Sequence, residues 1–214
     1  VLAAHLYTNY LWFRSVSATT VFTTQLAARV GLFLGFGLLL GGGFFGSLIL
    51  AYRLRPPVRR TNLDSELLLQ LRDNLDRRSR TLILLPAVVL GLIGGGVAAS
   101  QVQTFLAWTR ATDFGKGDAV FGIDASFYVF QLPWWRFVLA YLNFMVVACL
   151  VGSLLVHFLT GSMNAAAFRK TGNLPSAGKA AQRQVSVLLG LGLLLYGVSS
   201  FLDRYGYLTS QNSL

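Results

Sequence analysis

Residues 30–52 read VGLFLGFGLLLGGGFFGSLILAY, a run of apolar and small side chains without a single charge. A helix that crosses the hydrocarbon core of a bilayer needs about 20 mostly apolar residues, and this run is long enough. It is apolar around its whole circumference, which is typical of a helix in lipid and not of a surface helix in a soluble protein. The run therefore predicts a transmembrane helix.

The same pattern recurs along the chain. Of the 214 residues, 54% are hydrophobic and 12% are charged, whereas an ordinary soluble domain has about 25% charged residues. This composition argues against a soluble enzyme domain and against a disordered tail. The apolar runs are continuous and do not alternate with polar residues, which favours helices over the strands of a barrel. We predict an all-α integral membrane helical bundle with interfacial amphipathic helices and with four transmembrane helices at about residues 24–52, 81–108, 134–159 and 184–202.

The positive charges predict how the helices are oriented. The net charge is +10, and most of the Lys and Arg residues lie in the loops 53–80 and 160–183. Short loops rich in Lys and Arg stay in the cytoplasm. Both loops are therefore predicted inside, and the loop 109–133 and both ends of the chain outside. The basic residues then serve as topology signals and contacts to anionic lipid, not as a nucleic-acid surface.

The two connecting segments and the start of the chain add further expectations. In the first inner loop Leu63, Leu67, Leu71 and Leu75 recur every fourth residue after a helix-start signal at residues 61–64. Such a helix either lies on the inner leaflet or packs against the bundle or a partner. Because the chain begins outside without a signal peptide, we expect it to be a fragment of a longer protein.

Aromatic side chains gather at the predicted outer ends of the spans. Their rings favour the headgroup level of a membrane, so they predict an outer collar. The collar is one-sided, which suggests that the outer face also packs against another protein. Its members are Trp12, Trp108, Phe127, Tyr128, Trp134 and Trp135.

Small residues form a stripe in each of the first two predicted spans. In lipid, such stripes let two helix backbones approach closely. The first stripe is Gly31, Gly35, Gly42 and Gly46; the second is Ala87, Gly91, Gly95 and Ala98. They predict close contact between these two spans, or between one of them and a partner. Plain packing is favoured over a role in sliding or gating.

Few ionisable residues fall inside the predicted spans. His157 lies near the inner end of the third span, where it could ligate a haem or pigment or relay protons, but a simple hydrogen-bonded histidine is favoured. Arg29 and Asp203 lie at the outer ends of the first and fourth spans, and we predict a structural ion pair between them. Asn143 could form a hydrogen bond across helices.

The outer loop contains three carboxylates, Asp113, Asp118 and Asp124, among glycines. Their spacing does not match an EF-hand, so a tight loop in which Asp124 caps a helix at residues 125–132 is favoured over a calcium site. The single cysteine, Cys149, excludes an internal disulfide. No phosphate-binding loop, metalloprotease or serine-hydrolase motif is present in the sequence. We therefore expect no catalysis, no cofactor and no metal.

Several short motifs in this order resemble a bacterial family of uncharacterised large multi-pass membrane proteins, number one-eight-two of its series. They are NYLWF at 9–13, AYR at 51–53 with RP at 55–56, DFG at 113–115, FGIDASFYVFQLP at 121–133 and LDRY at 202–205. The resemblance covers nearly the whole chain. It implies a location in a bacterial plasma membrane or an equivalent inner membrane, further spans before and after the chain, and a large extracytoplasmic region. The sequence departs from the family pattern around residues 116–119, where an Asp-Pro pair is expected, and the family has no established activity.

The function expected from these features is that of a non-catalytic membrane anchor or scaffold. It would hold an extracytoplasmic domain or pack against a larger membrane complex. The expected partners are the lipid bilayer and other membrane subunits, or the missing parts of the protein itself. The alternative is a segment of a transporter or channel, and an intramembrane enzyme or cofactor carrier would depend on His157 alone.

Overall fold

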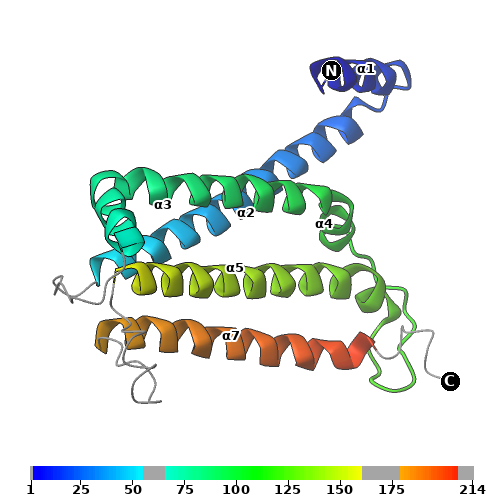
Figure 1. Ribbon diagram of the computed structural model, residues 1–214. Coiled ribbons are helices and arrows are strands. Elements are labelled where there is room, and N and C mark those ends of the chain that lie inside the picture. Colours follow the sequence, from blue (N-terminus) through cyan, green and yellow to red (C-terminus); the bar gives the residue numbers. More distant parts are fainter. Residues whose placement is uncertain (1, 55–65, 161–178, 207–214) are drawn as a thin grey trace. The chain divides into compact units, whose positions relative to one another are not determined.

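The computed structural model describes residues 2–54, 66–160 and 179–206, which are almost entirely helical (Figure 1). Side chains are described from residue 7 onward, except for those of residues 66–80. The described part of the chain contains no β-strand, and an isolated bridge joins Gly117 and Asp124. The elements are α1 (Leu2–Ser15), α2 (Thr19–Arg53), α3 (Glu66–Ser100), α4 (Val102–Thr109), η1 (Phe127–Gln131), α5 (Leu132–Leu159) and α7 (Lys179–Gly206). The all-α prediction is confirmed.

Four of the described helical segments are long and apolar enough to cross a membrane. They are Thr19–Arg53, Thr81–Ser100, Phe127–Leu159 and Lys179–Gly206. Each overlaps one of the four runs that the sequence marks as apolar. Helix α2 has 35 residues, which at 1.5 Å per residue is about 52 Å and exceeds the roughly 30 Å of a hydrocarbon core.

The helix that contains the second apolar run ends earlier than the run itself. At Gln101 the backbone leaves the helical region, with φ −87° and ψ 15°, and its N–H donates to the carbonyl of Ala98 at 3.0 Å. This short turn separates α3 from α4, so the span expected to continue to residue 108 ends at Ser100. The sequence gives little sign that the helix ends here, because Ser100 and Gln101 are only two polar residues within an otherwise apolar stretch.

Two expected amphipathic helices are continuous with the spans that follow them. Helix α3 already begins at Glu66, and the helix that begins at Ala125 continues through η1 into α5. Element η1 is one π turn, in which the Leu132 N–H reaches the carbonyl of Phe127. The expected cap at residues 61–64 and most of the inner loop 160–183 lie outside the described residues.

The chain divides into two compact units, which are described separately. The first contains Val1–Leu38 and Leu92–Trp134, and the second contains Leu39–Gly91 and Trp135–Leu214.

In the first unit the core is built around Trp134. This ring is only 5% exposed and stacks on Trp108 with ring centroids 5.6 Å apart. Phe105 and Phe36 approach Trp134 at 5.1 and 6.0 Å. The buried aliphatic side chains of the unit are Leu32, Ala98, Val102 and Leu132.

In the second unit the core is formed by three helices. Phe44, Leu48 and Ala51 recur at helical spacing on α2 and pack with Ile83 and Ala87 of α3 and with Cys149 and Val156 of α5. Gly152 of α5 makes room for a ring, since an added Cβ would lie 2.7 Å from Cε2 of Phe44. Leu188 of α7 packs against the same cluster.

The contacts also give the relative directions of the helices in the second unit. Along α5 and α7, Arg136 contacts Asp203, Val146 lies beside Gly192, and His157 bonds to Gln184, so these helices are antiparallel. Along α2 and α5, Gly43 lies beside Met145 and Ser47 contacts Cys149. Gly152 follows, beside Phe44 and Leu48, so α2 and α5 run parallel.

The glycines of α2 and α3 differ in what they contact. Gly95 lies against the Phe33 carbonyl, where an added Cβ would come within 2.6 Å, and Gly91 lies 3.2 Å from the Cβ position of Gly41. By contrast, an added Cβ at Gly31, Gly35, Gly42 or Gly46 would meet nothing within 4 Å. The contact therefore uses another face of α2 than the expected one. That face of α2 includes Phe33 and Gly41, which lie against Gly95 and Gly91 of α3. Contact of the exposed stripe with a partner stays a prediction.

Candidate functional site: a buried polar cluster beside an open pocket

A buried polar cluster joins three helices of the second unit. It consists of Ser47 of α2, His157 of α5 and Gln184 of α7. His157 is 0% exposed and Gln184 is 7% exposed. Since Gln184 bonds to both of the other residues, the cluster is a candidate site in a region where polar groups are costly.

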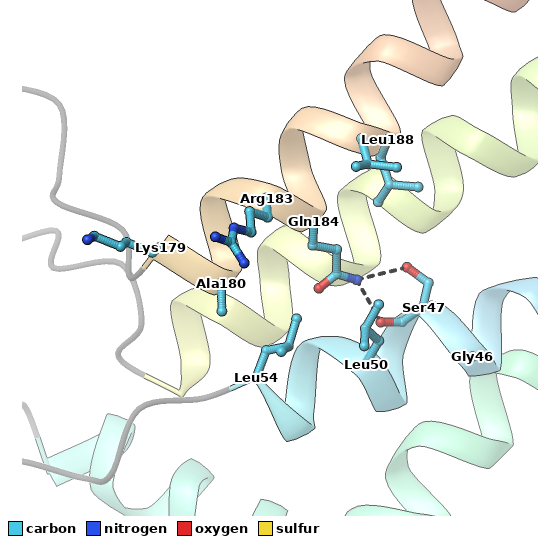
Figure 2. A pocket seen from close by; sticks show the side chains of 10 residues that line it. Gly46, Ser47, Leu50, Leu54, Lys179, Ala180, Arg183, Gln184 and Leu188 are labelled. Carbon is cyan, nitrogen blue, oxygen red and sulfur yellow. Dashed lines mark hydrogen bonds between the residues drawn. The ribbon is translucent and has the colours of Figure 1, made fainter.

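Gln184 is the centre of this hydrogen-bond network. Its Oε1 lies 3.1 Å from Nε2 of His157. Its Nε2 donates to the Ser47 carbonyl at 2.9 Å and to Ser47 Oγ at 3.3 Å (Figure 2). With the amide in this orientation, His157 donates from Nε2, which leaves Nδ1 without its hydrogen when the ring is neutral. Interhelical hydrogen bonds of this kind contribute about 0.6 kcal/mol on average in lipid, so the cluster adds modestly to the packing of the three helices.

The surroundings of His157 bear on whether it could act as a ligand or relay protons. The nitrogen that would be needed for a ligand is Nδ1, which is buried and has no hydrogen-bond partner among the described residues. None of the three clustered residues is a carboxylate, so the cluster lacks the partner that commonly orients a ligating or proton-transferring histidine. The favoured interpretation of a hydrogen-bonded histidine agrees with the Nε2 bond to Gln184.

Beside the cluster lies an open pocket of about 660 Å³ between α2 and α7 (Figure 2). Such a volume falls within the range of small-molecule sites, roughly 300–1,000 Å³. The lining residues occupy one face of each helix. They are Gly46, Ser47, Leu50 and Leu54 on α2 and Lys179, Ala180, Arg183, Gln184, Val187 and Leu188 on α7.

The pocket has a charged end and an apolar end. Along α7, Lys179 and Arg183 come first, Gln184 follows, and Val187 and Leu188 lie about one turn further on. The walls are open to the surroundings, because Val187 is 68% exposed and Leu50 is 47% exposed. The pocket thus combines two cations with a groove of exposed hydrocarbon.

The loop before η1, in the first unit, uses its carboxylates differently. Asp118 accepts bonds from the Val120 N–H at 2.6 Å and from the Tyr128 hydroxyl at 2.7 Å. Although desolvation acts in the opposite direction, the N–H of Val120 and the hydroxyl of Tyr128 lower the pKa of Asp118. Gly115 and Gly122 allow the tight turns of this loop, with φ of 68° and 66°.

Asp124 is the N-cap of the helix that leads into η1, as the sequence predicts. Its Oδ1 accepts the N–H of Ser126 at 2.8 Å and the N–H of Phe114 at 3.1 Å. The Ser126 N–H and, to a smaller extent, the Phe114 N–H lower the pKa of Asp124 to about 2. No group of three His, Cys, Asp or Glu side chains in the described ranges is placed to hold a metal ion. The carboxylates of this loop therefore organise its backbone.

The members of the expected aromatic collar have different environments. Trp134 is a core residue, and Trp108 stacks on it. Tyr128 is partly buried with its hydroxyl bound to Asp118. Trp12 and Trp135 are 60% and 43% exposed, and Phe127 is partly buried. Aromatic character alone does not distinguish a ring that lies at a membrane surface from one that fills a protein core, which is why Trp134 was assigned to the collar.

Asp203 forms an ion pair that the sequence analysis did not name. Its Oδ1 lies 3.4 Å from Nη2 of Arg136, and both side chains are largely exposed. Exposed pairs of this kind contribute about 0–1 kcal/mol. Arg29 belongs to the other unit, and a pair between Arg29 and Asp203 stays a prediction.

Comparison with known proteins gives a family for this arrangement. The profile of the Uncharacterised protein family (UPF0182) matches residues 1–214. A UPF0182 protein of Streptomyces coelicolor is 37% identical over 203 residues, which are 95% of this chain and 20% of that protein. The identity to a UPF0182 protein of Thermobifida fusca is 36% over 210 residues, 98% of this chain and 20% of that protein.

A third relative, from Mycobacterium avium, is 36% identical over 206 residues, 95% of this chain and 20% of its own length. No solved structure matches the chain. The chain spans about a fifth of the length of these curated relatives. With four helices apolar enough for a membrane and a profile match over its whole length, the chain belongs to the Uncharacterised protein family (UPF0182).

Proposed function

We propose that this chain is a non-catalytic membrane anchor within a longer protein. It holds an extracytoplasmic domain or packs against a larger membrane complex. The observation that carries the proposal is the exposure of α7: no residue from 185 to 202 is buried. An apolar surface of this size is unsuited to water and needs a cover of lipid or protein.

The directions of the helices support membrane embedding. Consecutive spans joined by loops on alternating sides must alternate in direction. In the second unit α5 and α7 are antiparallel, while α2 and α5, two spans apart, are parallel. This is the order that four consecutive crossings require.

The length of the relatives supports an anchoring role. The relatives are about five times as long as the chain, so a large part of such a protein lies outside it. The sequence contains no catalytic motif, and the polar cluster provides neutral hydrogen-bonding groups. Holding other parts of the protein in place is the role that fits both facts.

Transport is the second candidate, and the polar cluster is the observation that favours it. A path for a polar substrate needs polar side chains inside the bundle. Ser47, His157 and Gln184 provide them, and Gln184 also lines the open pocket. Gln184 already bonds to both His157 and Ser47, so these polar groups are occupied with one another and are less free to bind a transported substrate. For this reason the anchor is preferred.

The anchor is tested by labelling single cysteines in the full-length protein, in a cysteine-free background in intact cells. A reagent that does not cross membranes should modify Ala119→Cys at once and Thr61→Cys only after permeabilisation. Labelling of Thr61→Cys in intact cells would contradict the proposed orientation.

The role itself is tested on the purified protein. A stoichiometric partner or a stably held extracytoplasmic domain supports the anchor. Solute flux in proteoliposomes that stops when His157 is replaced by Ala would favour transport instead.

A further inference from the structure

The pocket between α2 and α7 has features that none of the roles above uses. The described residues that line it all belong to one unit. Its charged end and its apolar end lie along the same helix face. An occupant that matches both must be amphipathic and negatively charged.

We propose that this pocket binds one anionic phospholipid, with the phosphate between Lys179 and Arg183 and an acyl chain along Leu50, Val187 and Leu188. The proposal rests on the membrane-embedded function above, because a free-standing soluble protein would not meet such a ligand. Lys179 and Arg183 would then do more than orient the chain in the membrane, because they would hold one lipid at a defined place.

The charged end of the pocket fits a phosphate group. Lys179 and Arg183 are four residues apart on α7, so their Cβ atoms lie about 5–6 Å from each other on one face. None of the described residues that line the pocket is acidic, and the first turn of α7 contains no acidic residue. Arg can form two parallel hydrogen bonds to a phosphate, and Lys adds a point charge.

The apolar end fits a hydrocarbon chain. Leu50 on α2 and Val187 and Leu188 on α7 form the wall of this end. Leu54, one turn after Leu50, lies beside Ala180 at the charged end (Figure 2). Gly46 leaves the groove open, because a Cβ added there would meet nothing within 4 Å. A free phosphate would use the cations and leave this apolar wall exposed, whereas a phospholipid covers both.

The predicted orientation places the pocket at the correct depth. Arg53, at the end of α2, and Lys179, at the start of α7, adjoin the two basic loops that are predicted to face the cytoplasm. The cytoplasmic leaflet is rich in anionic lipids, and basic pockets between helices on this side bind their headgroups. The two cations would then lie at the headgroup level, with Leu50, Val187 and Leu188 in the hydrocarbon.

For the test, the full-length protein is purified in mild detergent, delipidated and supplied with phosphatidylglycerol or phosphatidylcholine. Native mass spectrometry then counts the lipids that stay bound. We expect one phosphatidylglycerol to be retained in preference to phosphatidylcholine. Arg183→Gln should weaken this binding about five-fold, the effect of one basic residue near a membrane surface. The matched control is Arg53→Gln, which removes a charge at the same end of the bundle but outside the pocket.

A second variant blocks the groove without touching the charges. Gly46→Leu fills the open space and should reduce phosphatidylglycerol binding to the level of phosphatidylcholine. Its control is Gly42→Leu, one turn earlier on α2, where a Cβ would also meet nothing within 4 Å but the pocket is not reached.

Three outcomes would overturn the proposal. They are equal retention of both lipids by the unmodified protein, equal effects of each variant and its control, and displacement of the lipid by glycerol phosphate alone, which would indicate a simple anion site. If Ala119→Cys and Thr61→Cys are labelled as expected, these outcomes remove only the lipid site. External labelling of Thr61→Cys would remove the anchor as well.

Discussion

The loop at residues 110–126 and the pocket between α2 and α7 both contain charged side chains, but the charges have different surroundings. In the loop, Asp118 and Asp124 together accept bonds from the backbone of Val120, Phe121, Phe114 and Ser126. In the pocket, Lys179 and Arg183 lie at the end of an open groove, and none of the other lining residues that the structure describes is acidic. Charges that are satisfied by the nearby backbone build local structure, whereas charges beside an open apolar surface are suited to binding something else. Stability should therefore depend on the loop, and lipid binding on the pocket.

The largest effect on stability is expected at the core beside the loop. Trp134→Ala removes a ring that packs on Trp108, Phe105 and Phe36, and such truncations cost about 3–5 kcal/mol. Hydrogen exchange of peptides from residues 98–134 in the full-length protein should show a correspondingly easier local opening. Trp135→Ala is the matched control, because Trp135 is 43% exposed. Equal effects of the two changes would show that Trp134 is not a core residue.

A smaller loss is expected when the cap of the loop is removed. Asp124→Ala deprives the N–H groups of Ser126 and Phe114 of their acceptor, so exchange at both amides should accelerate. Asp113→Ala is the control, since Asp113 accepts a single long bond of 3.4 Å from the Ser126 hydroxyl. If both variants behave alike, the hydrogen bonds that Asp124 accepts do not stabilise the loop. The contrast between structural charges in the loop and binding charges in the pocket would then not hold.

The pH dependence of the loop follows from the same bonds. The pKa of Asp124 is lowered from 3.8 to about 2, so its contribution to stability is complete above about pH 4 and is lost as the pH falls through 2. Loop protection, followed by hydrogen exchange corrected for the intrinsic rate, should decline only in this acidic range. In Asp124→Asn this acid-dependent step should be much smaller. A decline already between pH 5 and 7 would point to another group.

The fold was largely predictable because lipid imposes strong demands on a sequence. Long uncharged runs such as residues 30–52 leave few alternatives to a membrane helix. The rotation of each helix about its axis was not predictable from the same pattern. The stripe from Gly31 to Gly46 was predicted to contact α3 or a partner, but on α2 it is Phe33 and Gly41 that lie against α3.

The candidate site was less predictable than the fold. Ser47 and Gln184 are 137 residues apart in sequence, and Gln184 looked like the polar boundary of the fourth span. Because the hydroxyl, the imidazole and the amide come from three different helices, they have no characteristic spacing along the sequence that would reveal the site. The available signal was that each interrupts an apolar run near the same predicted membrane face, and this signal could have grouped them.

The smallest effect on stability is expected in the pocket. Arg183→Gln changes an exposed side chain, and surface substitutions usually change stability by no more than about 0.5 kcal/mol. Hydrogen exchange of α7 should therefore be unchanged in the same variant that loses lipid. A large change in α7 would mean that Arg183 supports the helix, and the division between loop and pocket would not hold.

The π turn at Phe127–Gln131 has a consequence for how this region can vary. A π turn is an α-helix with one additional residue, and it persists only where the neighbouring structure favours it. Deleting the exposed Val129 would restore a regular helix and swing the preceding side chains by about 100° around its axis. Tyr128 would then point away from Asp118. The additional residue thus sets the rotation about the helix axis that directs Tyr128 toward Asp118. A one-residue change in length here would disturb this contact more than most substitutions.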